Sequence, residues 1–207
     1  MIKQKIKDLM EEIGNAQLVT VTKSRSIEEI IEAIEAGARI LGENKIDEAR
    51  KKYNLLKEYL KKYNVEYHFI GHLQSNKVNK AVGFFDLIQS VDSVKLAEKI
   101  NRQAEEINVI QNILVQVNIG KEPQKYGIAP NEINEFIYTI SGLKNINIKG
   151  LMCIAPYGED PRPYFKDMKE IYDRFNFDYL SMGMTNDYKI AIKEGSNMVR
   201  IGTAIFS

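Results

Sequence analysis

The sequence is poor in the residues that build disulfides and metal clusters. Cys153 is the only cysteine among 207 residues, which excludes an intrachain disulfide and a cysteine-based metal cluster. Cys153 lies in the apolar run Leu151–Ile154, which favours a buried small side chain over a reactive thiol. His68 and His72 are the only histidines, and two histidines alone make a poor metal site.

The sequence also lacks an excess of either charge and any long apolar run. Its 29 basic and 28 acidic residues give a formal charge of +1, which provides no global attraction for nucleic acid or for an anionic membrane. No apolar run approaches the length of a membrane span, and the N-terminus has no cleavable hydrophobic region. We therefore expect a soluble, cytoplasmic protein that binds neither nucleic acid nor membrane.

Lysines are concentrated in one stretch of the chain. They alternate there with Glu and Tyr at helical spacing, which indicates a solvated helix face rather than a polyanion-binding patch; the stretch contains Lys51-Lys52, Lys57 and Lys61-Lys62. The whole chain is 44% hydrophobic and 28% charged, which is typical of a globular protein. We expect residues 1–207 to form a single domain.

Short β-rich runs alternate with longer amphipathic segments along the whole chain. The predicted strands are Leu18–Thr22, Arg39–Leu41, Tyr67–Ile70, Phe85–Gln89, Ile113–Val117, Ile148–Met152, Tyr179–Ser181 and Met198–Ile201. The predicted helices are Ile2–Ile13, Ile27–Ala36, Lys45–Tyr63, Ser75–Val82, Ser93–Ile107, Pro130–Ile140, Pro163–Phe175 and Asp187–Glu194. Ser26 and Glu29 have the spacing of a capping box before the second helix.

This alternation predicts an α/β protein: a single parallel (β/α)8 TIM barrel with an extra N-terminal helix. Parallel strands need a returning helix between them, and eight strand–helix units close naturally into a barrel. An open doubly wound sheet is the alternative. No Gly-x-Gly-x-x-Gly follows the first strand, which argues against that sheet as a dinucleotide binder.

In such a barrel, the functional groups lie at the C-terminal ends of the strands, and phosphate is frequently bound after strands 7 and 8. The first strand runs into Lys23 and the second into Gly42-Glu43-Asn44. The seventh runs through Ser181 to Thr185, and the eighth runs through Arg200 to Gly202 and Thr203. Hydroxyls and glycines therefore gather at the two loops where backbone N–H groups could hold a phosphate.

These segments, in this order and spacing, resemble the pyridoxal phosphate homeostasis family, whose barrel is similar to the N-terminal domain of alanine racemase. The resemblance runs nearly end to end. It is carried by Val21-Thr22-Lys23, Leu41–Asn44, His68–Gly71, Leu73–Lys77, Gln116–Ile119, Gly150–Met152, Leu180–Met184 and Val199–Phe206.

The resemblance implies that pyridoxal 5'-phosphate is bound by Lys23 as an internal aldimine. It implies phosphate contacts from Thr185, Gly202 and Thr203, with Thr185 standing where the family usually has serine. It also places Arg200 against the pyridine nitrogen and Asn44 near the cofactor. We count Ser181, at the end of the seventh strand, among the cofactor-binding residues. The roles of Glu43, His72, Lys77 and Asn118 stay open.

Each of these residues also has an ordinary structural interpretation. A lysine after an apolar strand points into the barrel mouth, where partial desolvation would favour the neutral amine; most lysines, however, are surface charges. Arg200 could pair with a carboxylate on a neighbouring strand. Gly202 could simply end a strand, and Thr185 could cap a helix.

The expected function is intracellular carriage and buffering of pyridoxal phosphate, without turnover. Alanine racemase takes its second base from a C-terminal domain, and this chain ends shortly after the eighth strand, so we expect no racemisation and a monomer. The expected partners are the cofactor and recipient apoenzymes. One alternative is a minimal racemase or decarboxylase that uses Lys23 alone. Another is a cofactor-free aldolase in which Lys23 forms a Schiff base with a phosphorylated carbonyl substrate; a scaffold protein is a third.

Overall fold

β-branched and other apolar runs form eight strands in the computed structural model, which describes residues 1–207. The strands pair in parallel and in chain order, and β1 pairs with β8, which closes the barrel. They are β1 (Gln17–Val21), β2 (Ile40–Glu43), β3 (Glu66–Phe69), β4 (Leu87–Val91), β5 (Gln111–Val117), β6 (Ile146–Cys153), β7 (Tyr179–Met184) and β8 (Met198–Ile201). The predicted barrel is therefore confirmed.

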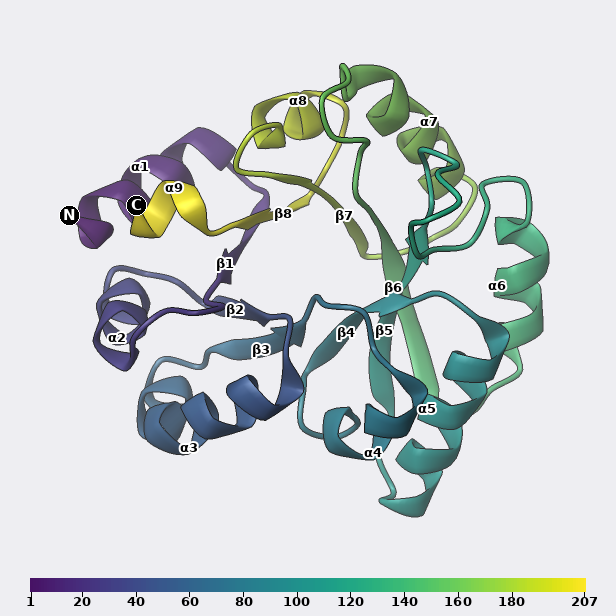
Figure 1. The fold of residues 1–207 in the computed structure, drawn as a ribbon, viewed down its shortest axis with the longest axis horizontal. Coiled ribbons are helices and arrows are strands. Elements are labelled where there is room, and N and C mark those ends of the chain that lie inside the picture. The colour runs from purple at the N-terminus through teal and green to yellow at the C-terminus, as the bar shows by residue number, and fades with distance from the viewer.

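Helices surround the barrel on all sides (Figure 1). They are α1 (Ile2–Ile13), α2 (Ile27–Glu35), α3 (Ile46–Lys62), α4 (Val78–Ala81), α5 (Val94–Glu106), α6 (Ile133–Ser141), α7 (Arg162–Tyr172), α8 (Tyr188–Lys193) and α9 (Thr203–Phe206), with a 3-10 turn at Ser75–Lys77 before α4. None of them combines the length and the apolar composition that a bilayer crossing requires.

Local sequence signals define how α2 begins. The Ser26 hydroxyl accepts a hydrogen bond from the Glu29 N–H, and the Glu29 carboxylate accepts one from the Ser26 N–H. This is the predicted capping box, which satisfies donors that the first turn of a helix leaves free. Because α2 begins at Ile27, the segment between β1 and α2 is a short turn that contains Lys23.

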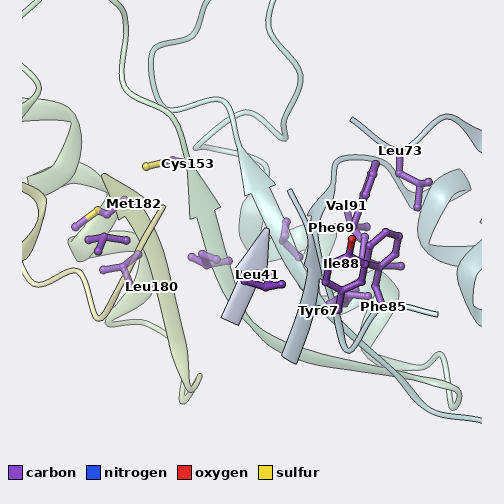
Figure 2. Packing of buried hydrophobic residues seen from close by; sticks show 14 of the residues in the cluster. Leu41, Tyr67, Phe69, Leu73, Phe85, Ile88, Val91, Cys153, Leu180 and Met182 are labelled. Carbon is purple, nitrogen blue, oxygen red and sulfur yellow. The ribbon is translucent and has the colours of Figure 1, made fainter. Parts of the chain in front are cut away.

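The alternation of side chains along each strand creates two hydrophobic cores. The larger one has 48 buried residues and lies between the barrel and the helices. Figure 2 shows part of it, with Tyr67, Phe69, Phe85 and Ile88 gathered on one side and Leu180 and Met182 on the other. The smaller core fills the barrel interior with Val19, Ile40, Leu87, Leu114, Met152 and Met198.

Both ends of the described chain lie side by side (Figure 1). Helix α9 contacts α1, and the Lys5 ammonium donates to the backbone carbonyl of Ser207. Helix α8 is tied to α1 as well, because Glu12 accepts from the Tyr188 hydroxyl and pairs with Lys189. The N-terminal helix thereby supports the two segments that follow β7 and β8.

Some predicted boundaries are wrong, and packing explains why. β4 runs over Leu87–Val91 rather than Phe85–Gln89, because Phe85 packs in an aromatic cluster before the strand begins, 5.5 Å from the Tyr67 ring. β7 continues past Ser181 to Met184. Helix α9 was not predicted, because four residues are too few to show a helical period.

One expected surface lysine is buried. Lys52 was assigned to the solvated face of the long charged helix, yet only 7% of the residue is exposed. Burying an ammonium is costly unless it is paired, and Lys52 is surrounded by acceptors. Lys51 and Lys57 are exposed as predicted.

Candidate functional site

A cavity of about 440 Å³ opens at the C-terminal ends of the strands. Its walls come from the ends of β1, β7 and β8 and from the loop between β6 and α7. Of the seven predicted site residues, five line it: Lys23, Thr185, Arg200, Gly202 and Thr203. Its volume is within the range of small-ligand sites in proteins.

Lys23 lies at the mouth of this cavity, on the turn after β1. The Lys23 side chain is exposed in the structure of the chain alone, so the expectation that its ammonium is partly desolvated there is wrong. The next residue, Ser24, has a φ of 59°, a left-handed conformation that a non-glycine residue adopts only at some cost. The turn that carries Lys23 therefore needs support from the surrounding structure.

Helix α3 supplies that support through a buried ion-pair network. The Lys52 ammonium lies 2.6 Å from the Thr22 carbonyl oxygen, 2.9 Å from Glu43 Oε1 and 2.6 Å from Glu48 Oε1. The Thr22 hydroxyl donates to Glu43 Oε1, and the Ser24 N–H donates to Glu48 Oε1. The residues on both sides of Lys23 are thus held by the same three charged groups.

Burial affects the two carboxyl groups of this network differently. Burial raises the pKa of Glu43, against the hydrogen bonds from Thr22 and Lys52, which act to lower it. Burial also acts to raise the pKa of Glu48, but the hydrogen bonds from Lys52 and the Ser24 N–H outweigh it, and that pKa is lowered. Lys52 therefore has one carboxylate partner that ionises readily and one that is costly to ionise.

The opposite wall is formed by the turns after β7 and β8. Gly183 has a φ of +95°, and a Cβ there would lie 2.6 Å from the Ala191 Cβ, so only glycine fits this close approach to α8. Asp187 accepts a hydrogen bond from the Met184 N–H at 2.6 Å, which fixes the β7–α8 turn. Thr185 lies inside that turn, and Gly202 and Thr203 begin α9.

Arg200 forms part of the cavity wall from inside the barrel. Only 4% of the residue is exposed, and its guanidinium donates to Ser181 Oγ at 2.7 Å and to the Cys153 carbonyl at 2.8 Å. It pairs with no carboxylate on a neighbouring strand, which was the structural interpretation considered for it. Burial lowers the pKa of Arg200 from its ordinary value, and burial raises the pKa of the Cys153 thiol to about 12. Cys153 is a buried free cysteine, as its apolar run predicted.

Two predicted residues lie outside the cavity lining. Ser181 is fully buried below it and reaches it only through Arg200. Asn44 follows β2 and packs its backbone against Gly71, where an added Cβ would come within 2.4 Å of the Asn44 carbonyl oxygen. The Asn44 side-chain oxygen is buried and has no hydrogen-bond partner. In the β1–β2 register Val21 pairs with Gly42, so Lys23 and Asn44 follow their strands at the same end of the barrel.

Sequence reasoning missed the loop between β6 and α7 and one further lysine. The loop lines the cavity from Ile154 to Pro161, and the exposed fraction of Tyr157 is 94%. Its proline and glycine content marks a loop, and its place after β6 puts it at the C-terminal end, so the signal was present. Lys125, from the loop after β5, also lines the cavity and pairs with Glu122 at 2.5 Å.

The charges around the cavity favour an anionic ligand. Two arginines and two lysines line it, against the carboxylates of Glu159 and Asp187. Both carboxylates accept hydrogen bonds elsewhere, Asp187 from the Met184 N–H and Glu159 from the Tyr164 hydroxyl. Two of the cations are themselves paired, Arg25 with Glu29 and Lys125 with Glu122, whereas the Arg200 guanidinium has no carboxylate partner. Fold and site together define a parallel barrel protein that presents a primary amine and several cations to a small ligand.

Comparison with known proteins narrows this class. Residues 1–207 match the family described as "Alanine racemase, N-terminal domain". The chain is 41% identical, over 92% of its length and 86% of the relative's, to the pyridoxal phosphate homeostasis protein of Aquifex aeolicus. It is 37% identical to the protein of the same name from Haemophilus influenzae, covering all of this chain and 92% of the relative. The chain belongs to the pyridoxal phosphate homeostasis protein family.

Solved structures agree with this assignment. The structure of PipY from Synechococcus elongatus with PLP bound superimposes with a TM-score of 0.92 at 32% identity, and the match covers both chains completely. Alanine racemase from Clostridium difficile is similar in fold, with a TM-score of 0.76 at 17% identity over 98% of this chain and 54% of that one. The barrel is therefore shared with a larger enzyme.

Proposed function

We propose that this chain binds pyridoxal 5'-phosphate in the cavity at the C-terminal ends of its strands, and that it acts in the cytoplasm as a monomeric carrier and buffer of that cofactor. The observation that carries the proposal is the position of Lys23, whose amine lies at a cavity that is also lined by the Arg200 guanidinium, which pairs with no carboxylate. The names of its relatives and the ligand of PipY support the same ligand for this chain.

The residues present fit this cofactor. When bound, pyridoxal phosphate supplies an aldehyde that can accept a primary amine, together with a pyridine ring and an anionic phosphate. Lys23 is the amine that we assign to a Schiff base with it. Val21, Met184 and Ile190 give the cavity an apolar wall suited to a ring. The buried, unpartnered oxygen of Asn44 provides an acceptor at the same end of the barrel.

We assign phosphate binding to Thr185, Gly202 and Thr203. These residues lie on the turns after β7 and β8, where barrel proteins frequently bind phosphate. The threonine hydroxyls and nearby backbone N–H groups are donors, and hydrogen bonds to an ionised acceptor are about twice as strong as neutral ones. The phosphate would then orient the ligand between these turns and Lys23.

We assign Arg200 to the pyridine nitrogen, with Ser181 holding the guanidinium in place. A guanidinium stays protonated and cannot accept a hydrogen bond, so it favours an unprotonated ring nitrogen. An unprotonated ring withdraws electrons less strongly than one held by a carboxylate. For this reason we propose a carrier without turnover of its own.

A transfer experiment tests the carrier function. The protein is loaded with pyridoxal phosphate, freed of excess ligand by gel filtration, and mixed with the apo form of a pyridoxal phosphate-dependent transaminase. We expect the transaminase to regain activity at the expense of the cofactor on this protein, and we expect the loaded protein to elute as a monomer. Failure to load with pyridoxal phosphate would contradict the proposal. If the protein instead formed a Schiff base only with a different phosphorylated aldehyde or ketone, the aldolase alternative would be favoured.

A further inference from the structure

A continuous line of hydrogen bonds crosses the barrel interior. Glu66 Oε2 lies 2.8 Å from His68 Nε2, and His68 Nδ1 lies 3.1 Å from Gln89 Nε2. Gln89 Oε1 lies 2.7 Å from Ser181 Oγ, which is 2.7 Å from the Arg200 guanidinium. The line begins on β3 and β4 and ends on β7 and β8, which lie across the barrel from them (Figure 1).

The two ends of the line are in different surroundings. Glu66 is the first residue of β3, and its side chain is 53% exposed beside a small cavity that is also lined by Asp86, Asn112 and Lys149. Arg200 lines the cavity assigned to the cofactor, at the other end of the barrel. The three residues between them are fully buried, so water cannot replace a missing partner at His68, Gln89 or Ser181.

Arg200 and the burial of Ser181 together set the direction of the bonds in the line. A guanidinium can only donate, so Ser181 Oγ accepts from Arg200. The buried Ser181 hydroxyl then satisfies its own proton by donating to Gln89 Oε1. The Gln89 amide then presents its nitrogen, a donor, to His68 Nδ1, which must accept. The proton of a neutral His68 is therefore on Nε2, where it meets Glu66.

Glu66 supports that arrangement from the other end. The hydrogen bond from His68 lowers the pKa of the Glu66 carboxyl, against an opposing effect of burial. The group is then an ionised acceptor, which requires a proton on the imidazole nitrogen that faces it. The Gln89 amide at Nδ1 and the Glu66 carboxylate at Nε2 therefore require the same His68 tautomer, with the proton on Nε2.

A second proton on His68 would disturb the whole line. A proton on Nδ1 would face the Gln89 amide nitrogen, so the amide would have to turn over. Ser181 would then receive donors from both Gln89 and Arg200, and its own proton would be left without an acceptor in a fully buried position. The charged groups near His68 are Glu66 on its own strand and, beyond Glu66, Arg39, Asp86 and Lys149.

We propose that His68 is a positioning residue for Arg200: its neutral Nε2–H tautomer, held by Glu66, orders Gln89 and Ser181 so that the Arg200 guanidinium is fixed at the cavity. The effect on bound cofactor rests on the proposed function, whereas the tautomer and the order of the line belong to the chain alone. Glu66 and His68 thereby influence the position of Arg200 at the cavity without contacting the ligand themselves.

Imidazole nitrogen NMR tests the tautomer directly on the unloaded protein. Because the chain has two histidines, the variant His72→Gln leaves one imidazole and assigns the spectrum. At neutral pH we expect His68 Nδ1 to resonate as an unprotonated nitrogen and Nε2 as a protonated one. A proton on Nδ1, in either the other tautomer or the imidazolium, would overturn the proposal.

Two substitutions of His68 test the positioning of Arg200. His68→Asn retains an acceptor near the place of Nδ1, whereas His68→Leu removes it. Proton exchange at the Arg200 guanidinium can be followed by NMR without ligand. It should accelerate about tenfold in His68→Leu, because losing a hydrogen bond to a charged group changes an equilibrium by about that factor. In His68→Asn it should stay near the original rate. Equal exchange in the two variants would show that His68 does not position Arg200.

A second site in the line covers the case in which His68→Leu does not fold. Gln89→Glu replaces the amide donor with an acceptor, so His68 must carry a proton on Nδ1 to meet it. The nitrogen spectrum should change accordingly, and the visible absorption maximum of cofactor-loaded protein should shift. An unchanged His68 spectrum in Gln89→Glu would contradict the proposal, while failure of the chain to load would bear only on the proposed function.

Discussion

The ammonium of Lys52 donates a 2.6 Å hydrogen bond to the carbonyl oxygen of Thr22, the residue immediately before Lys23. One end of this contact is a buried side chain on α3, and the other is the backbone that presents the candidate cofactor lysine. The turn after β1 is thus held from behind by an ion pair, while its amine faces the cavity.

Replacing Lys52 with Met should destabilise the fold by about 3 kcal/mol at pH 7.5, because removing one member of a buried pair leaves the other uncompensated. Urea unfolding would measure this. The exposed neighbour Lys51 provides the control, and Lys51→Met should change the free energy of unfolding by less than about 0.5 kcal/mol.

The loss in Lys52→Met should shrink at lower pH. The pKa of Glu43 is already raised by burial and rises further without its partner, so the folded variant takes up a proton more readily than the unfolded chain. Stability gained in this way is complete below the unfolded pKa near 4.5 and is lost as the pH rises through the folded pKa. The double variant Lys52→Met/Glu43→Gln should recover much of the loss at pH 7.5. A deficit that is the same at pH 5.5 and 7.5 would exclude this explanation.

Gly183→Ala should destabilise the protein by about 1–3 kcal/mol and weaken cofactor binding. The residue has a positive φ, and a Cβ would press on Ala191 and on the backbone of Tyr188, which displaces the turn that carries Thr185. Gly142→Ala is the matched control, since φ there is −77° and nothing lies within 4 Å of the added carbon. If both variants behaved alike in thermal unfolding and cofactor titration, the close packing at Gly183 would not matter.

Phosphate recognition should provide much of the affinity. Pyridoxal without its phosphate should bind at least about tenfold more weakly, and Thr185→Val should weaken pyridoxal phosphate by about tenfold or more, because each lost charge-assisted hydrogen bond costs about 1.5–3 kcal/mol. Thr139→Val, on α6 and away from the cavity, is the control. Equal affinity for the two ligands in a fluorescence titration would remove the phosphate site from these turns.

The loaded protein should not turn over amino acids at an enzymatic rate. In the proposed complex, Arg200 faces the ring nitrogen as a donor, whereas enzymes that use the cofactor as an electron sink can place a carboxylate there. Deuterium incorporation at the α-carbon of alanine should therefore stay below about 1 s⁻¹, the low end of enzyme turnover. A faster rate that disappears in Lys23→Ala would establish the minimal racemase instead.

The sequence predicted the barrel and five residues of the cavity lining because these depend on local patterns. β-branched runs such as Leu18–Thr22 mark the strands, and the residues after them, such as Lys23 and Thr203, lie at the functional end of the barrel. The line from Glu66 to Arg200 was not predicted. His68 and Ser181 are more than a hundred residues apart, and only the closed barrel, through Gln89, connects them.

Lys52 shows the complementary failure. Its sequence neighbourhood is that of a solvated charged helix, and nothing local distinguishes it from Lys51. Its burial follows from Glu43 on β2, which faces outward toward α3 between the barrel and the helix. An ion pair between a helix and a strand, such as Lys52–Glu43, depends on how the helix is oriented against the barrel. The periodicity of the sequence does not determine that orientation.

Peptide mapping after borohydride reduction tests the central claim most directly. The protein is incubated with pyridoxal phosphate, reduced, digested and analysed by mass spectrometry, in parallel with Lys23→Ala and with Lys125→Ala, which removes the other lysine of the cavity. The account predicts that the added mass is on Lys23, persists in Lys125→Ala and is absent in a folded Lys23→Ala protein. Label on Lys125, or on no lysine of the cavity, would contradict it.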